Sequence, residues 1–204
     1  MNFKNNVNFL FEVSSLRHVD RTWKQFFDDS VANNAEHIFR VIWIALTLAK
    51  MEGAKNHEKI LKMAMVHDLP ESRAGDVHYL SRQYVERKQT EAARDMFAGT
   101  VHEAEMLEIF EEYEKRECLE AKIVKDADTL DIELETKEYE AKGFTIRQKI
   151  APQRKAGVYT RLFTKSAKKM WDEIDKTDPH DWHNQSPKNR HLGGDWKVDK
   201  KKKS

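Results

Sequence analysis

Three places in the sequence carry histidine or aspartate where a helix that packs against its neighbours would normally carry aliphatic side chains. They are His37, the adjacent pair His67-Asp68, and Asp128. A buried aspartate without a partner costs several kcal/mol, because its charge loses hydration. A divalent cation removes that penalty, and two imidazoles with two carboxylates form a mixed nitrogen and oxygen ligand shell. These four residues are therefore the candidates for a metal site.

Helices are the elements that must position these residues. Only 7 glycines and 4 prolines occur in 204 residues, and apolar residues recur at helical spacing, with no strand alternation and no internal repeat. The expected fold is all-α, a single-domain helical bundle over residues 1–177, followed by a polar, basic tail over 178–204 that is partly disordered. We expect helices over residues 3–16, 34–53, 56–68, 101–115, 119–142 and 158–174, with a polar helical segment over 77–98.

The composition excludes several classes of protein. Lys and Arg number 36 and Asp and Glu 35, giving a net charge of +1, so no overall field attracts nucleic acid. A single cysteine, Cys118, excludes an intramolecular disulfide framework. No apolar run reaches the roughly 18 to 20 residues that cross a bilayer, and the N-terminus lacks the pattern of a signal peptide. We expect a reduced, cytoplasmic protein that neither enters a membrane nor binds nucleic acid specifically.

The order and spacing of the four candidate ligands resemble the signature of the HD-domain metal-dependent phosphohydrolases. The flanking residues narrow the resemblance to the 5′-deoxynucleotidase branch of that superfamily. They are N-x-A-E-H ending at His37, M-x-H-D-x-x-E-x-x-x-G-D from Met65 to Asp76, and D-A-D ending at Asp128. The resemblance extends from about residue 16 to residue 171 and does not include the tail.

The resemblance implies that the four residues bind one divalent ion, Mn²⁺ or Co²⁺, with Mg²⁺ as the alternative. A water bound to that ion would attack the phosphate. Glu71 would orient or deprotonate the water, and Asp76 would bind the sugar or help to protonate the leaving 5′-oxygen. Alternatively, Glu71 and Asp76 would together hold a second cation.

The resemblance also implies a set of substrate contacts. Arg21 offers a planar donor fork that suits a phosphate dianion. Trp23 would stack on the base or form a wall of the sugar pocket, although Thr22 separates it from Arg21 where the family can have the two adjacent. The remaining candidates continue the motif and would line the pocket with Asp76. They are Val77, His78 and Tyr79.

We therefore expect an enzyme that hydrolyses nucleoside, especially deoxynucleoside, 5′-monophosphates to nucleoside and phosphate, and that forms a homodimer. A first alternative is an HD-domain phosphohydrolase for another substrate, such as a nucleotide polyphosphate, a cyclic dinucleotide or a phosphorylated metabolite. A second alternative is a non-catalytic binding module.

Overall fold

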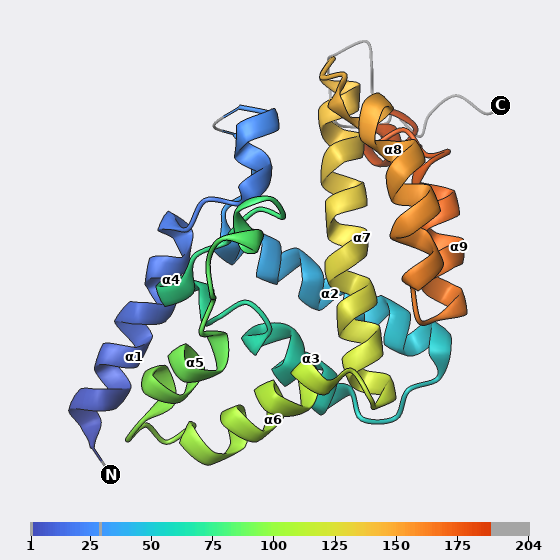
Figure 1. The fold of residues 1–204 in the computed structure, drawn as a ribbon. Helices are drawn as coiled ribbons and strands as arrows, with labels where there is room; N and C mark the ends of the chain where they lie inside the picture. Colours follow the sequence, from blue (N-terminus) through green and yellow to red (C-terminus); the bar gives the residue numbers. More distant parts are fainter. Residues whose placement is uncertain (1, 29, 189–204) are drawn as a thin grey trace, which may run out of the picture.

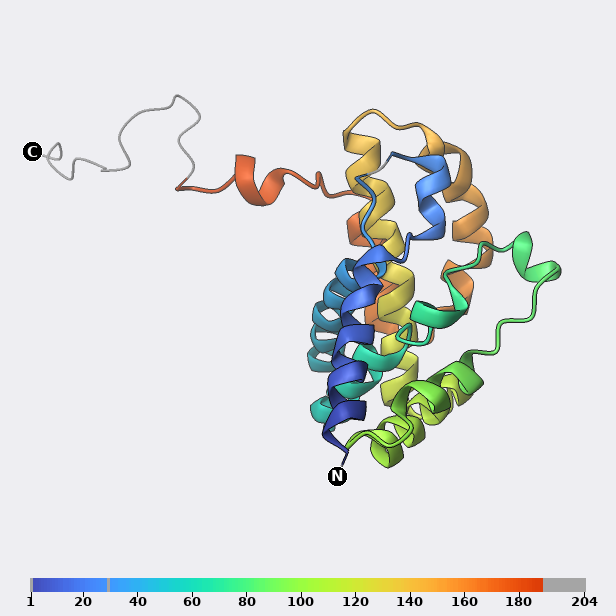
Figure 2. The same ribbon diagram turned by 90° about the vertical axis from the view of Figure 1, so that its left-hand side faces the viewer.

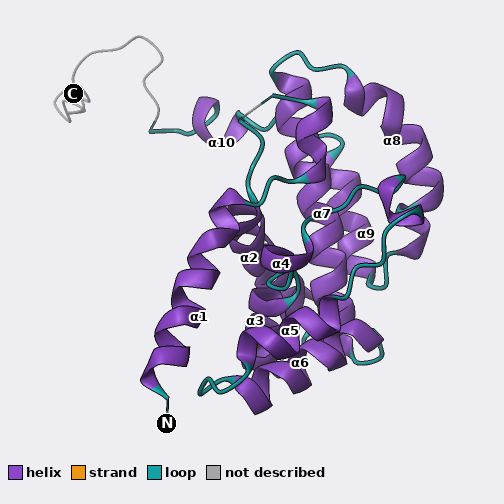
Figure 3. Cartoon of the chain, turned by 60° about the vertical axis from the view of Figure 1, so that its left-hand side comes forward, coloured by secondary structure: helices purple, strands orange, loops and turns teal. Residues whose placement is uncertain are grey.

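The computed structural model describes residues 2–28 and 30–188, and within them the chain is built from helices and loops, with no strand (Figure 3). The expected all-α, single-domain bundle is confirmed. The longer helices are α1 (Phe3–Ser15), α2 (Asn34–Glu52), α3 (His57–Val66), α5 (Gln89–Phe97), α6 (Glu103–Lys115), α7 (Leu119–Ala141), α8 (Ile146–Gly157) and α9 (Lys165–Ile174). The short ones are α4 (Glu71–Ala74), α10 (Asp181–Asn184) and the 3₁₀ turns η1 (Leu16–His18), η2 (Thr22–Phe26), η3 (Ser81–Gln83) and η4 (Tyr159–Arg161).

Helix α7 is the central element of the fold. It runs through the middle of the molecule, with α8 and α9 on one side and the N-terminal helices on the other (Figure 1). It packs against α2, α3, α6, α8 and α9. The core between these helices is made of fully buried aliphatic residues, among them Val41, Leu48, Ile60, Met63 and Ile123. The three helices that carry the candidate ligands therefore share one rigid core.

Local sequence signals set the ends of α2, the helix that carries His37. Asn33 accepts a hydrogen bond from the backbone N–H of Glu36, and the Glu36 side chain accepts one from the backbone N–H of Asn33, which forms a capping box. Gly53 closes the helix in the left-handed conformation, at φ 68°, which glycine adopts without strain. These caps agree with the boundaries expected from the sequence.

Two segments differ from the expected helices. Of residues 77–98, only Gln89–Phe97 forms a helix, and the preceding residues form a loop around η3 that projects from the body (Figure 2). The expected helix over 158–174 is shorter, Lys165–Ile174, and α8 lies before it. Helix α8 was missed because Pro152 lies inside it and because its buried residues are Arg147 and Arg154 rather than an apolar stripe.

No helix within the described part of the chain is long and apolar enough to cross a membrane. Of the tail that was expected over 178–204, the structure includes α10. The disorder expected of its last residues falls on 189–204, which lie outside the described residues.

Candidate active site

The four candidate metal ligands come together. His37 lies in α2, His67 and Asp68 follow the last turn of α3, and Asp128 lies in the middle of α7. One ligand atom from each falls within 4.8 Å of every other. The Nε2 atoms of the two histidines are 3.3 Å apart, and His37 Nε2 lies 3.3 Å from Asp68 Oδ2 and 3.4 Å from Asp128 Oδ1.

Outer hydrogen bonds turn both imidazoles toward this point. The Nδ1–H of His37 donates to Asp131 Oδ2 at 2.6 Å, and the Nδ1–H of His67 donates to the Ala64 carbonyl at 2.8 Å. Each Nε2 is then left to bind a cation. Adjacent ligands about 2.1 Å from a cation lie about 3 Å from one another, which is close to the spacing seen here. The donor set therefore fits a divalent ion.

The charge of the cluster leads to the same conclusion. Burial and the nearby Arg21 act to lower the pKa of His37, but its hydrogen bonds with Asp128, Asp131 and Asp68 outweigh them and raise it well above its usual value. His67 is equally buried, and desolvation lowers the pKa of its imidazole. The carboxylates thus favour positive charge at this place, and a divalent cation would supply it.

Glu71 lies beside the cluster, at the start of α4, and only 3% of its surface is exposed. Its Oε2 accepts from the Asn34 amide at 3.1 Å, and its Oε1 accepts from Arg87 at 3.2 Å. Burial, together with the nearby Asp68 and Asp76 carboxylates, raises the pKa of Glu71 to about 9. A cation bound beside Asp68 would offset these acids and lower the pKa of Glu71 again, leaving its carboxylate to accept a proton.

Arg21 is buried against the acids of the site. Its NH1 group lies 3.3 Å from Asp68 Oδ2 and 3.5 Å from Asp76 Oδ2, and it donates to the Asn34 side-chain oxygen at 3.4 Å. Its Nε is buried without a hydrogen-bond partner. Asp76 also accepts from the backbone N–H of Thr22 at 3.0 Å, so the segment that carries Arg21 and Trp23 is tied to the motif residues after α4.

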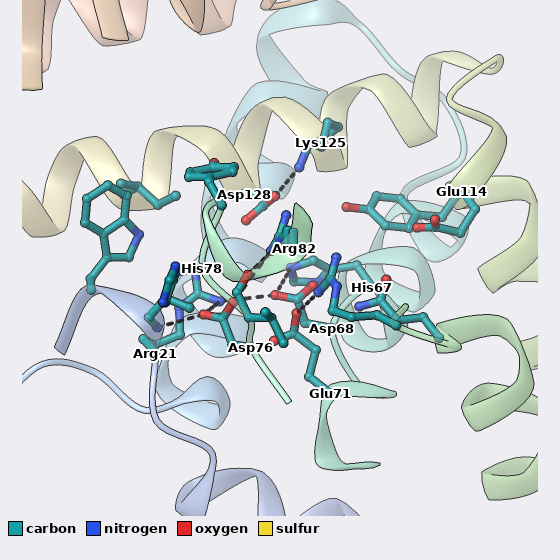
Figure 4. Close-up of a pocket in the computed structure, with 18 of the residues that line it drawn as sticks. Arg21, His67, Asp68, Glu71, Asp76, His78, Arg82, Glu114, Lys125 and Asp128 are labelled. Atoms are coloured by element: carbon teal, nitrogen blue, oxygen red, sulfur yellow. Dashed lines mark hydrogen bonds and ion pairs between the residues drawn. The ribbon is translucent and has the colours of Figure 1, made fainter. Parts of the chain in front are cut away.

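A cavity of about 260 Å³ opens onto these groups (Figure 4). The catalytic and substrate residues expected from the sequence all line it: Arg21, Trp23, Glu71, Asp76, Val77, His78 and Tyr79. Three of the four candidate ligands, His67, Asp68 and Asp128, line it too, while His37 lies behind them, 1% exposed. Trp23 also packs on Phe26, with ring centroids 5.9 Å apart, and Tyr79 is 66% exposed at the mouth.

Several residues of the site were not singled out from the sequence. Asn34 is one of them: it is fully buried and joins Arg21 to Glu71. Lys125 lies 2.6 Å from Asp128 Oδ2, and the three-residue spacing that places both on one helix face was a usable signal. Asp131 was expected outside the ligand set, and there it supports His37. The other lining cations had no such signal: Arg82, Arg87 and Arg116.

Comparison with known proteins identifies the class to which this fold and site belong. A family model described as HD domain matches residues 13–171, and the chain belongs to that family. Among curated relatives, 5′-deoxynucleotidase hdd1 of Schizosaccharomyces pombe is 32% identical over 146 residues, which cover 67% of this chain and 73% of the relative. The 5′-deoxynucleotidase HDDC2 of Danio rerio is 30% identical over 143 residues, which cover 67% of this chain and 70% of the relative.

Solved structures support the same assignment of fold. A protein from Pyrococcus horikoshii superposes with a TM-score of 0.69 at 26% identity, over 83% of this chain and 98% of its own. A conserved hypothetical protein from Pyrococcus furiosus gives a TM-score of 0.68 at 25% identity, over 84% of this chain and 99% of its own. The resemblance to the HD-domain phosphohydrolases is thereby confirmed.

Proposed function

We propose that this protein is a metal-dependent 5′-deoxynucleotidase that hydrolyses nucleoside, preferentially deoxynucleoside, 5′-monophosphates to nucleoside and phosphate. The observation that carries this proposal is the convergence of His37, His67, Asp68 and Asp128 within 4.8 Å. Beside them, one cavity brings together a proton acceptor, Glu71, and cationic side chains. The names of the relatives supply the substrate class.

The four ligands are proposed to hold one divalent ion, and two imidazole nitrogens among them favour Mn²⁺ or Co²⁺ over Mg²⁺, which prefers oxygen ligands. When bound, the ion would supply Lewis-acid chemistry, lowering the pKa of water and withdrawing charge from the phosphate. A second cation held by Glu71 and Asp76 is disfavoured by their partners, because each acid already has an arginine within 3.5 Å.

The side chains of the cavity divide the remaining work of hydrolysis. Glu71 takes a proton from the attacking water as the new O–P bond forms and the P–O5′ bond breaks, and this proton then passes to the leaving 5′-oxygen to give the nucleoside. Arg21 faces the phosphate and compensates its charge, and Asp76, held by Arg21 and Thr22, is placed for the sugar or the leaving 5′-oxygen. Trp23, Val77, His78 and Tyr79 form the wall for the nucleoside.

Three further properties belong to the proposal. The protein forms a homodimer, supported by the exposed Phe39 and Trp43, one turn apart on α2. It is located in the cytoplasm, consistent with a single cysteine, Cys118, in the sequence. Residues 1–177 form the catalytic domain and 178–204 a tail without a part in catalysis.

The test is a matrix of metals against nucleotides on the purified protein. Metal-free protein is reloaded with Mn²⁺, Co²⁺ or Mg²⁺, and phosphate release is measured from each deoxy- and ribonucleoside 5′-monophosphate. Release from at least one deoxynucleotide is expected, and Asp68→Ala should abolish both metal binding and turnover while circular dichroism stays helical. No release across the matrix from protein that demonstrably holds metal would reject the 5′-deoxynucleotidase, leaving an HD-domain phosphohydrolase for another substrate or a binding module.

A further inference from the structure

A second hollow adjoins the catalytic cavity. It measures about 340 Å³ and shares four lining residues with the cavity, Tyr79, Arg82, Arg116 and Lys125. We name this hollow the basic annex. Its other lining residues come from α7 and from the segment between α8 and α9: Asp126, Thr129, Val158, Arg161, Leu162 and Phe163. Four of the ten lining side chains are cationic, and a single one is acidic.

The acid in the annex does not neutralise these cations. Asp126 Oδ1 accepts from the backbone N–H of Phe163 at 2.9 Å, and Oδ2 accepts from the backbone and hydroxyl of Thr164, each at 2.8 Å. Arg161 is exposed, donates to the Gly157 carbonyl at 2.9 Å, and forms no ion pair within the described residues. Of the other three cations, Lys125 pairs with Asp128 at 2.6 Å, Arg116 pairs with Glu114 at 3.2 Å, and Arg82 lies 3.7 Å from Asp76. Arg161 is therefore the annex cation whose charge a ligand anion can compensate.

One of the cations is held rigidly at the junction of the two hollows. Arg116 is the C-cap of α6 in the left-handed conformation, φ 56°, and is alone in this among the non-glycine residues that the structure describes. Its guanidinium carbon lies 3.3 Å from the centre of the Tyr113 ring, and Tyr113 packs edge-on against His67. The NH1 atom of Arg116 is buried without a hydrogen-bond partner. Its NH2 atom pairs with Glu114 at 3.2 Å, so the guanidinium keeps one unpaired donor, NH1, at the junction.

The cavity and annex together have a direction along α7. Lys125, Asp128 and Ile132 line it on successive turns, so the lined stretch is about 10 Å long. The aromatic end of the cavity lies near Ile132. Arg154 contacts both Trp23 and Glu133, and Glu133 directly follows Ile132 in α7. Lys125 marks the opposite, cationic end. A nucleotide whose 5′-phosphate meets Asp128 thus has its nucleoside toward Trp23, and any further 5′-phosphate toward the annex.

We propose that the basic annex binds the second phosphate of a nucleoside 5′-diphosphate or 5′-triphosphate, so that these nucleotides occupy the site and compete with monophosphates. The orientation rests on the proposed function, since it places the 5′-phosphate at the metal. A 3′-phosphate on the same nucleoside would lie at the aromatic end and would not reach the annex. The two kinds of second phosphate therefore give a matched pair of probes.

The experiment uses the full chain loaded with Mn²⁺ and measures binding as competitive inhibition of the initial release of deoxycytidine from deoxycytidine monophosphate, a readout that tolerates slow consumption of a probe. The probes are deoxycytidine 5′-(α,β-methylene)diphosphate, which resists hydrolysis between its phosphates, and deoxycytidine 3′,5′-bisphosphate. Arg161→Glu is the test variant, because Arg161 lines the annex and not the catalytic cavity. Lys149→Ala, an exposed cation on α8 that lines neither hollow, is the control.

We expect Arg161→Glu to weaken binding of the methylene diphosphate about tenfold, and more at low than at high salt. Binding of the 3′,5′-bisphosphate should change less than twofold, and Lys149→Ala should affect neither probe. Unchanged binding of the methylene diphosphate, or equal weakening of both probes, would overturn the inference. Its failure is distinguishable from failure of the proposed function, because hydrolysis of deoxycytidine monophosphate by the same two variants is measured separately and should match that of the unmodified protein.

Discussion

At the scale of single residues, the support for the proposed metal site comes from groups that hydrogen-bond to the candidate ligands. Asp131 is fully buried and binds both His37 Nδ1 and the Arg40 side chain. Asp131→Asn replaces the carboxylate that fixes the tautomer of His37 by a neutral amide. We expect the affinity for Mn²⁺ to fall about 10- to 100-fold, measured by calorimetry on metal-free protein.

The matched control for this prediction is Glu138→Gln. Glu138 also pairs with Arg40, at 3.0 Å, but does not contact His37. Its Mn²⁺ affinity should stay within about twofold of the unmodified protein. Equal losses in both variants would show that Asp131 acts through Arg40 and not through the imidazole.

Asn34 carries the second prediction at this scale. Its amide donates to Glu71 and to the Asp68 carbonyl, and its oxygen accepts from Arg21. Asn34→Ala leaves buried polar groups unpaired, which costs about 1–3 kcal/mol of stability. We expect kcat for deoxynucleoside monophosphates to fall about tenfold, since both Glu71 and Arg21 lose a positioning contact.

The neighbouring asparagine provides the comparison. Asn33 caps α2 and does not line the catalytic cavity, so Asn33→Ala should cost about 1 kcal/mol of stability and leave kcat within about twofold. Steady-state kinetics and thermal unfolding of the two variants separate a positioning role from a loss of helix stability. An unchanged kcat in Asn34→Ala would refute the role assigned to Asn34.

At the scale of elements, a buried ion cluster attaches α8 to α7 and α9. Glu133, 1% exposed, accepts from Arg147 at 3.0 Å and from Arg154, and Arg147 also reaches Asp175. Glu133→Ala leaves two guanidinium groups buried without their shared anion. We expect the free energy of unfolding in urea to fall by about 3–5 kcal/mol.

An exposed pair provides the reference for this cluster. Glu111 on α6 pairs with Arg94 on α5, and both side chains are exposed to water. Glu111→Ala should change the free energy of unfolding by less than about 1 kcal/mol. If Glu133→Ala does not fold, Glu133→Gln keeps the shape and one acceptor oxygen, and an intermediate loss is expected. A loss below about 1 kcal/mol in both Glu133 variants would contradict a structural role for the cluster.

The same cluster explains which elements could be predicted from the sequence. Helices α2, α3 and α7 have apolar stripes and capping residues, and they were predicted to within a few residues, so the convergence of the candidate ligands they carry could be anticipated. Helix α8 buries Arg147 and Arg154 on partners supplied by α7, so its periodicity is visible only once Glu133 is placed beside it. The 77–88 loop was read as helix because its polar residues resemble an exposed face, whereas Arg87 is in fact drawn to Glu71.

Some of the cavity-lining residues could not be predicted from the sequence, because their positions also depend on partners from other elements. The positions of His37, His67, Asp68 and Asp128 follow from residue type and helix face. The contacts of Arg82, Arg87 and Arg116 depend on loops and on a helix C-terminus, whose courses are set by tertiary packing rather than by local periodicity.

At the scale of the whole molecule, buried acids of α7 affect how stability varies with pH. Burial raises the pKa of Glu135, against the opposing effects of Arg40 and of the Ala32 N–H that it accepts. Because this pKa is higher in the folded state, the folded protein binds more protons, and this glutamate makes the free energy of unfolding fall as pH rises from about 4.5 toward the folded pKa.

A glutamine at this position would accept the same hydrogen bond without titrating. Glu135→Gln should therefore gain stability relative to the unmodified protein as the pH rises above about 4.5, and a difference that stays constant or shrinks in urea titrations would refute this.

The assembly state gives the last prediction. Phe39 and Trp43 are 65% and 60% exposed, one turn apart on α2, the helix that carries His37. Large aromatic side chains grouped on a helix face mark contact surfaces, and a second copy of this chain is the proposed occupant.

Light scattering during gel filtration should give about twice the chain mass of 24.0 kDa for the unmodified protein and the mass of a single chain for Trp43→Glu. Tyr84→Glu, at an 83% exposed aromatic on the 77–88 loop, should remain dimeric. A dimer that survives Trp43→Glu and Phe39→Glu together would place the interface elsewhere, and a monomeric unmodified protein would reject the dimer.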